Sequence, residues 1–193
     1  MNEENLLTKI SKMSNDEREN LAYNTSGVEI LNILANDESE FVRQFVACNE
    51  HTPVETLETL SNDEKHWVRA EVARNKNATV TILSKLAKDR HENVRFEVAQ
   101  NKNSSAETLI LLAKDISWSI RSNVARNPSS PSKALALLIN DDVWWVSRDV
   151  ALNKNTPSEL LLKLTKDKNI QISKIAEETL KERTVKKEQN IER

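Results

Sequence analysis

Apolar residues return along this chain every 26 positions, in columns that hold their register from one copy to the next. Such self-similarity at a fixed period is the signature of a repeat protein. The aliphatic, alanine and leucine columns are Val42, Val68, Val94, Ile120, Val146 and Ile172; Val46, Val72, Val98, Val124 and Val150; Ala47, Ala73, Ala99, Ala125 and Ala151; Leu31, Leu57, Leu83, Leu109, Leu135 and Leu161; and Leu34, Leu60, Leu86, Leu112, Leu138 and Leu164. We expect about six stacked units that share one continuous core.

Each copy divides into two short amphipathic helices. Thr52 and Glu55 have the spacing of a capping box, which predicts a helix over about 53–62 with two leucines facing inward. Asp63 is a candidate N-cap for the other helix, whose apolar stripe ends at Asn75. The same box spacing occurs at Ser26 and Glu29, Ser104 and Glu107, and Thr156 and Glu159.

Composition agrees with an all-helical chain. The 193 residues include a single glycine, whereas hairpin turns and phosphate-binding loops consume glycine. A net charge of −2 gives no bias toward nucleic acid or membrane, and no apolar run reaches the roughly 18 residues of a membrane helix. The start, MNEENLLTKI, carries acids where an export signal carries bases. With one cysteine, Cys48, we expect no cofactor, no metal and a cytoplasmic setting.

The segments IRSNVARNPSSPSKALALLIND (120–141) and VSRDVALNKNTPSELLLKLTKD (146–167) resemble the leucine-rich repeat variant family of bacterial proteins. The resemblance implies a right-handed superhelix of short helices, some of them 3₁₀, and it implies no particular activity. Some relatives bind an iron–sulfur cluster through a cysteine group that this chain lacks. The spacing of Asp63 and Arg69 also resembles HEAT repeats, in which Asp and Arg form a ladder between neighbouring units.

We therefore predict an all-α fold, a short right-handed α-solenoid of two-helix repeats of 26 residues. Residues 1–15 would form an N-terminal cap, and 16–176 would form about six repeats with a rod-like or arc-like outline. Residues 177–193 would form a charged C-terminal cap or tail, a solvated and frayed helix.

Two polar columns each have two interpretations. Asparagine tolerates the left-handed conformation that ends a helix, so a structural role is favoured over ligand contact for Asn49, Asn75, Asn101, Asn127 and Asn153. The arginine column could form a structural ladder with the aspartates six residues earlier, or a stripe that binds anions. Its members are Arg43, Arg69, Arg95 and Arg121, and the fifth copy departs from it with Ser147 followed by Arg148.

Tryptophan gives the sharpest functional signal, because all four fall in two adjacent columns at the start of the valine helix. Other copies place polar residues there, so the fold does not require an aromatic ring. The rings either form a binding surface or cap the core at the repeat junctions. These columns contain Trp67, Trp118, Trp144 and Trp145, together with Phe41 and His66.

The pattern predicts a non-catalytic scaffold that binds a protein partner through this edge. The predicted binding residues are Trp67, Trp118, Trp144, Trp145, Phe41, His66, Arg121 and Arg148.

The alternative is nucleic-acid binding, since some HEAT-like DNA glycosylases combine tryptophan, arginine and a carboxylate in a concave cleft. The corresponding residue types here are Trp118, Trp144, Trp145, Arg121, Arg148, Asp141 and Asp142, although the net charge disfavours phosphate binding. A third class is a regulatory domain without a stable ligand.

Overall fold

The structure is a computed structural model that describes residues 3–191, with side chains described from residue 5 to residue 185. Every regular element in this range is an α-helix, which confirms the all-helical repeat fold. The 3₁₀ geometry implied by the family resemblance is wrong for these residues, because the short helix of each repeat is also α-helical. The helices are α1 (Glu3–Ile10), α2 (Asn15–Asn24), α3 (Val28–Leu34), α4 (Glu40–Cys48), α5 (Val54–Leu60), α6 (His66–Arg74), α7 (Val80–Leu86), α8 (Glu92–Gln100), α9 (Ala106–Leu112), α10 (Trp118–Arg126), α11 (Ser132–Leu138), α12 (Trp144–Leu152), α13 (Ser158–Leu164) and α14 (Ile170–Ile191).

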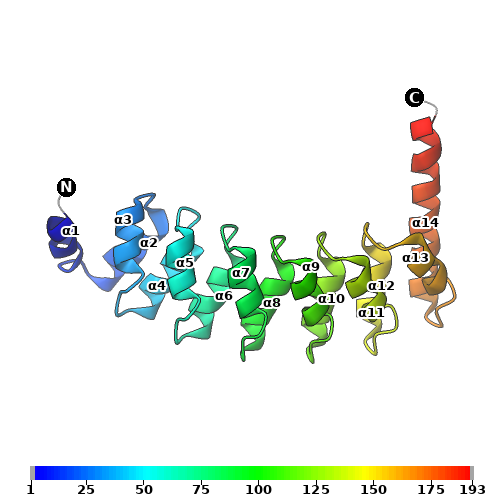
Figure 1. Ribbon diagram of the computed structural model, residues 1–193, viewed down its shortest axis with the longest axis horizontal. Coiled ribbons are helices and arrows are strands. Elements are labelled where there is room, and N and C mark those ends of the chain that lie inside the picture. Colours follow the sequence, from blue (N-terminus) through cyan, green and yellow to red (C-terminus); the bar gives the residue numbers. More distant parts are fainter. Residues whose placement is uncertain (1–2, 192–193) are drawn as a thin grey trace. The chain divides into compact units, whose positions relative to one another are not determined.

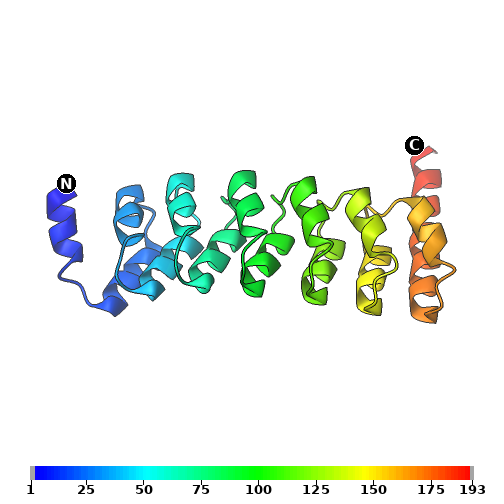
Figure 2. The same cartoon turned by 60° about the horizontal axis from the view of Figure 1, so that its bottom comes forward.

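The chain divides into two compact units, one ending at Asn103 and the other beginning at Ser104. In the first unit, α2, α4, α6 and α8 pack side by side, and α3, α5 and α7 each pack against the helix that follows (Figure 1). In the second unit, α10, α12 and α14 pack in the same way, while α9, α11 and α13 form the other layer (Figure 2). Within each unit, the longer helix of one repeat therefore packs directly against the longer helix of the next.

The predicted apolar columns form the core between the two layers. Val68, Val72 and Ala73 of α6 and Leu57 of α5 are completely inaccessible to solvent, and Leu60 is nearly so. Burial of a valine or leucine side chain contributes about 1.5–3 kcal/mol relative to exposure. Because the same positions are buried in the neighbouring copies, short helices that would be marginal alone are stabilised by stacking.

The asparagine column connects neighbouring repeats rather than adopting the left-handed conformation. Asn75 Nδ2 donates to the carbonyl oxygens of Ala47 at 2.8 Å and Asn49 at 2.9 Å, and its Oδ1 accepts from the Asn77 N–H at 2.8 Å. The left-handed prediction is wrong, because no described residue has positive φ and Asn75 has an extended backbone (φ −60°, ψ 134°). The side chain is needed to satisfy carbonyl groups at the end of the preceding helix. Asn49, Asn101 and Asn153 make equivalent bonds.

The arginine column forms a ladder of ion pairs, which we call the arginine ladder. Arg69 Nε and Nη2 bind both oxygens of Asp89, in the next repeat, at 2.6 and 2.9 Å. Its Nη1 donates to the carbonyl oxygen of Asp63, six residues earlier, at 2.6 Å. Each guanidinium therefore fastens its own repeat to the following one. The other rungs are Arg18–Asp37, Arg43–Asp63 and Arg121–Asp141.

The predicted capping boxes are wrong, because the N-cap of each of these helices is the residue after the predicted one. Thr52 Oγ1 donates to the carbonyl oxygen of Val46 at 2.6 Å, so it satisfies the end of the preceding helix, and Pro53 becomes the N-cap of α5. A capping box does form between Ser14 and Glu17 at the start of α2. At the other predicted starts, the N-caps of α3, α6, α9 and α13 are Gly27, Lys65, Ser105 and Pro157.

The charged segment near the C-terminus continues α14 and is attached to the preceding repeat. Arg183 Nη1 donates to the carbonyl oxygen of Thr156 at 2.6 Å, and Nη2 donates to that of Lys154 at 2.9 Å. Thr179 Oγ1 donates to the carbonyl oxygen of Ala151 at 3.1 Å. These side chains take the place that asparagine has in earlier repeats, so the prediction of a frayed, solvated helix is wrong at Arg183.

Candidate binding site

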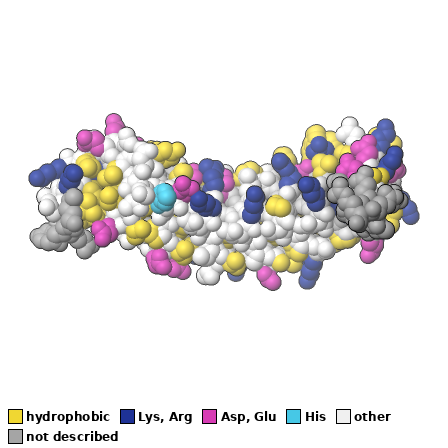
Figure 3. All heavy atoms as spheres, turned by 90° about the horizontal axis from the view of Figure 1, so that it is seen from above, with side chains coloured by type: hydrophobic (Ala, Val, Ile, Leu, Met, Phe, Trp, Pro, Cys, Tyr) yellow, Lys and Arg dark blue, Asp and Glu magenta, His cyan; other side chains and the backbone are white. Residues whose placement is uncertain are grey.

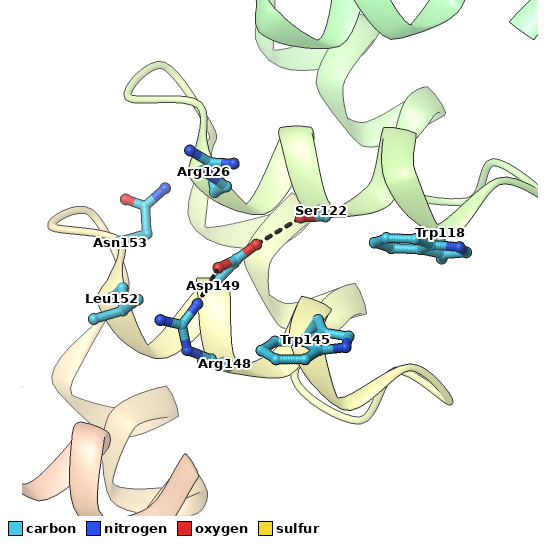
Figure 4. A pocket seen from close by; sticks show the side chains of 8 residues that line it. All are labelled: Trp118, Ser122, Arg126, Trp145, Arg148, Asp149, Leu152 and Asn153. Carbon is cyan, nitrogen blue, oxygen red and sulfur yellow. Dashed lines mark hydrogen bonds and ion pairs between the residues drawn. The ribbon is translucent and has the colours of Figure 1, made fainter. Parts of the chain in front are cut away.

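Helices α10 and α12 present matching faces to an open pocket in the second unit. Trp118, Ser122 and Arg126 follow one another at intervals of four residues, which places them on one side of α10. On α12, Trp145 and Leu152 lie seven residues apart, which is also close to whole helical turns. The pocket has a volume of about 650 Å³ and is lined by Trp118, Ser122, Arg126, Trp145, Arg148, Asp149, Leu152 and Asn153 (Figure 4).

Two indole rings form one end of the pocket. Trp118 is 50% exposed and Trp145 is 47% exposed. Trp144 is less exposed and stacks on Trp145, with ring centroids 3.7 Å apart and an angle of 27° between the planes. The Arg148 guanidinium lies 5.9 Å from the centroid of a Trp145 ring. Exposed apolar groups gathered in this way mark interaction surfaces in folded proteins.

A buried carboxylate occupies the middle of the pocket and joins its two walls. Asp149 is only 7% exposed. Its Oδ2 accepts a hydrogen bond of 2.5 Å from the Ser122 hydroxyl, and its Oδ1 lies 3.3 Å from Arg148 Nη1 (Figure 4). Because Ser122 belongs to α10 and Asp149 to α12, the bond between them links the two helices.

Two arginines of the pocket lie outside the arginine ladder. Arg126 is exposed and forms no hydrogen bond or ion pair with any described residue. Arg148 follows Ser147, which stands in the ladder column and donates instead to the carbonyl oxygen of Leu138 at 3.2 Å. The one-residue displacement places the arginine of the fifth copy in the pocket. With Arg126, Arg148 and Asp149, the lining carries a net positive charge.

The structure brings Trp118, Trp145 and Arg148 together, out of the predicted binding residues. Trp144 does not line the pocket but stacks on Trp145. Arg121 belongs to the ladder, where its Nε lies 2.6 Å from Asp141 and its Nη2 lies 2.7 Å from Asp142. Hydrogen bonding to Asp141 also raises the pKa of the Arg121 guanidinium, so Arg121 stays charged and paired with Asp141.

The other predicted residues lie in the first unit. The His66 and His91 rings stack with centroids 3.3 Å apart, and Trp67 meets His66 edge-on at 5.0 Å. The Trp67 ring nitrogen is buried and has no partner among the described residues. Burial, then the neighbouring His91 and Arg69, lowers the pKa of His66. Phe41 is 53% exposed.

Five pocket residues were not among the predicted binding residues: Ser122, Arg126, Asp149, Leu152 and Asn153, the last of which had been assigned a structural role. Their signal lay in helical spacing, since Ser122 and Arg126 follow Trp118 by one and two turns. Alignment at 26 residues compares equivalent positions in different repeats, and it does not show which residues share a face within one helix.

The described residues contain no group of three histidine, cysteine or acidic side chains that could hold a metal ion. Partial burial, and then the neighbouring Glu71, raises the pKa of the Cys48 thiol, whereas an activated thiol needs a lowered pKa.

None of the described helices has both the length and the hydropathy that crossing a membrane requires.

The comparisons with known proteins place the fold. Among solved structures, the chain is similar to a leucine-rich repeat variant with a novel repetitive structural motif, with 25% identity and a TM-score of 0.70. The match covers 93% of this chain and 72% of that one. An engineered protein matches over 94% of this chain and 96% of its own, with 18% identity and a TM-score of 0.41. No family model and no curated protein matches. The chain is thus an all-helical repeat protein similar in structure to a leucine-rich repeat variant.

Proposed function

We propose that this chain is a non-catalytic repeat scaffold that binds a protein partner through the pocket between α10 and α12. The observation that carries the proposal is the pair of half-exposed indoles, Trp118 and Trp145, in one pocket with the unpaired Arg126. Tryptophan and arginine are the residues most enriched at the energetic centres of protein interfaces. Asp149 holds the two walls together, so the surface is formed before a partner arrives.

Binding of nucleic acid is less well supported. Of the residues that resemble a glycosylase set, Arg121, Asp141 and Asp142 bind one another in the ladder. Figure 3 shows acidic side chains beside basic ones on both units, and the whole chain carries a net charge of −2. Phosphate binding needs several uncommitted cations close together, and this pocket offers two arginines.

A selection of random peptides of about twelve residues, displayed on phage, tests the proposal. Immobilised wild-type protein should enrich peptides that bind in the micromolar range, and the double variant Trp118→Ala/Trp145→Ala should lose them by at least about tenfold. Leu137→Ala is the matched control, because Leu137 is an exposed apolar residue of the same unit outside the pocket.

Two outcomes would contradict the proposal. Peptides that bind the double variant as well as wild type would show that the indoles are not the contact site. Tight binding of fluorescein-labelled oligodeoxythymidine at low salt, lost in the same double variant, would favour nucleic acid instead.

A further inference from the structure

We infer that the pocket between α10 and α12 recognises an extended acidic peptide, in which a large apolar side chain and a carboxylate lie about three or four residues apart. This inference rests on the proposed function and specifies the partner. The apolar side chain would cover Trp118 and Trp145, and the carboxylate would bind Arg126.

The paired arginine of the first unit indicates which kind of anion Arg126 can bind. Arg74 stands at the same repeat position as Arg126, two repeats earlier. Its Nη2 lies 2.7 Å from Glu97, a residue of the next repeat, and its Nε donates to the same carboxylate at 3.1 Å. At this repeat position, a carboxylate of the next repeat can therefore lie beside the arginine and pair with it.

In the second unit, no described carboxylate pairs with the equivalent arginine, Arg126. The residue equivalent to Glu97 is Asp149, which is one methylene shorter. Asp149 turns to Ser122 and Arg148 instead, and Ser122 stands where the first unit has Ala70, which offers no hydroxyl. Arg126 consequently has its guanidinium free for a carboxylate from outside, which can bind it through two parallel hydrogen bonds.

The length of the pocket sets the spacing of the peptide. Trp118 and Arg126 are eight residues apart on α10, which is about 12 Å along a helix. Figure 4 shows the two tryptophans at one end and Arg126 at the other, with the Ser122–Asp149 bond between them. An extended peptide rises about 3.3 Å per residue, so about three or four residues separate its two contacts.

The test uses peptides enriched on the wild-type protein and measures their affinity by fluorescence anisotropy. We expect these peptides to carry Asp or Glu about three or four positions from a large apolar residue. Replacing that acid by its amide, or moving it next to the apolar residue, should weaken binding to the wild type by about tenfold. Arg126→Gln should cause the same loss for the acidic peptide and no further loss for the amide.

Two variants sharpen this test. Asp149→Glu combined with Ser122→Ala recreates the first-unit arrangement, so the longer carboxylate should pair with Arg126 and weaken the acidic peptide as Arg126→Gln does. Lys133→Gln is the charge-matched control, since Lys133 is exposed on α11 outside the pocket and should leave affinity unchanged. Thermal unfolding of each variant verifies that it is folded.

The failures can be told apart. If enriched peptides need the two tryptophans but bind Arg126→Gln as tightly as wild type, the acidic specificity is wrong and the protein-binding proposal stands. If no enriched peptide depends on the tryptophans, both are wrong. If labelled oligodeoxythymidine displaces the acidic peptide from wild type and itself requires Arg126, the anion is a phosphate and the inference is overturned.

Discussion

The side chain of Asn75 joins two stretches of backbone, 47–49 and 75–77, that no regular hydrogen-bonding pattern would join. Its amide donates to two carbonyl groups of the preceding repeat and its oxygen accepts from the turn that follows. Asparagine was expected at this position for its backbone tolerance, and it is required for its side chain instead. The sequence column located the residue correctly, but the choice between the two roles depends on the neighbouring repeat.

Replacing Asn75 separates these two roles. Asn75→Ala and Asn75→Gly should both reduce the free energy of unfolding by about 2 kcal/mol, because each leaves buried carbonyl groups without a donor. Urea denaturation measures the change. Asn36→Ala serves as the control, since the Asn36 side chain donates to the Asn32 carbonyl within its own exposed turn and binds no other described repeat. A glycine variant as stable as wild type would restore the left-handed interpretation.

We expect His66 to make the stability of the first unit dependent on pH. Because burial and His91 lower its pKa, the unfolded chain binds a proton more readily than the folded chain. Stability is therefore fully present above the unfolded pKa of about 6.5 and decreases as the pH falls below it. Arg69, Arg90 and Asp89 also act on this ring, and Asp89 opposes the shift.

The measurement is the urea midpoint at about pH 7.5 and about pH 5.5. The wild type should lose more stability over this interval than His66→Gln, which has no proton to gain there. The carboxylate of Asp89 does not affect the comparison: burial raises its pKa, but the hydrogen bonds from Arg69 and from the His91 N–H, together with the charge of Arg69, outweigh burial and hold the pKa below its usual range. Equal pH dependence in the two proteins would exclude His66 as the cause.

At the scale of the element, the sequence predicts the existence of the helices better than their ends. The leucine and valine columns locate both helices of each repeat because burial repeats with the same period. The starts are less predictable, since a threonine hydroxyl such as that of Thr52 can bind either the following helix or the preceding one. Which partner it takes depends on how the helices pack.

The arginine ladder gives a prediction about how helices of neighbouring repeats are fastened. Arg69 and Asp89 are both about 90% buried, so Arg69→Met should destabilise the protein by about 3 kcal/mol by leaving a carboxylate unpaired. Adding Asp89→Asn should restore part of the loss, because the second substitution removes the buried charge. Thermal and urea denaturation of the two single variants and the double variant measure the coupling; strictly additive effects would contradict it.

In the candidate site too, the sequence predicts some residues and does not predict others. The tryptophan columns indicate where aromatic residues gather, and the structure places Trp118 and Trp145 in one pocket. Arg126 could not be singled out from its column, because Arg74 occupies the same position and is paired. Two differences distinguish their surroundings, Asp149 in place of Glu97 and Ser122 in place of Ala70, and both matter only after the helices are packed.

At the scale of the whole molecule, partners are close in sequence. Each rung of the arginine ladder reaches forward by about 20 residues, and each asparagine reaches back by 24 to 28. Folds dominated by such local contacts form quickly, because little loop entropy is lost before a contact is made. This locality also explains why a single sequence was enough to predict the repeat fold.

These fixed offsets carry a consequence for how such a chain can evolve. If one 26-residue repeat were duplicated or deleted in frame, an arginine of the ladder would still meet an aspartate in the next repeat. Every asparagine would likewise still meet the carbonyl groups of the unit before it. Copy number can therefore change in a single genetic event without any new interface being invented, and duplication yields spare copies. One such copy can then carry an aspartate where another carries a glutamate, as Asp149 does where Glu97 stands two repeats earlier, so that Arg126 is left unpaired while Arg74 is paired.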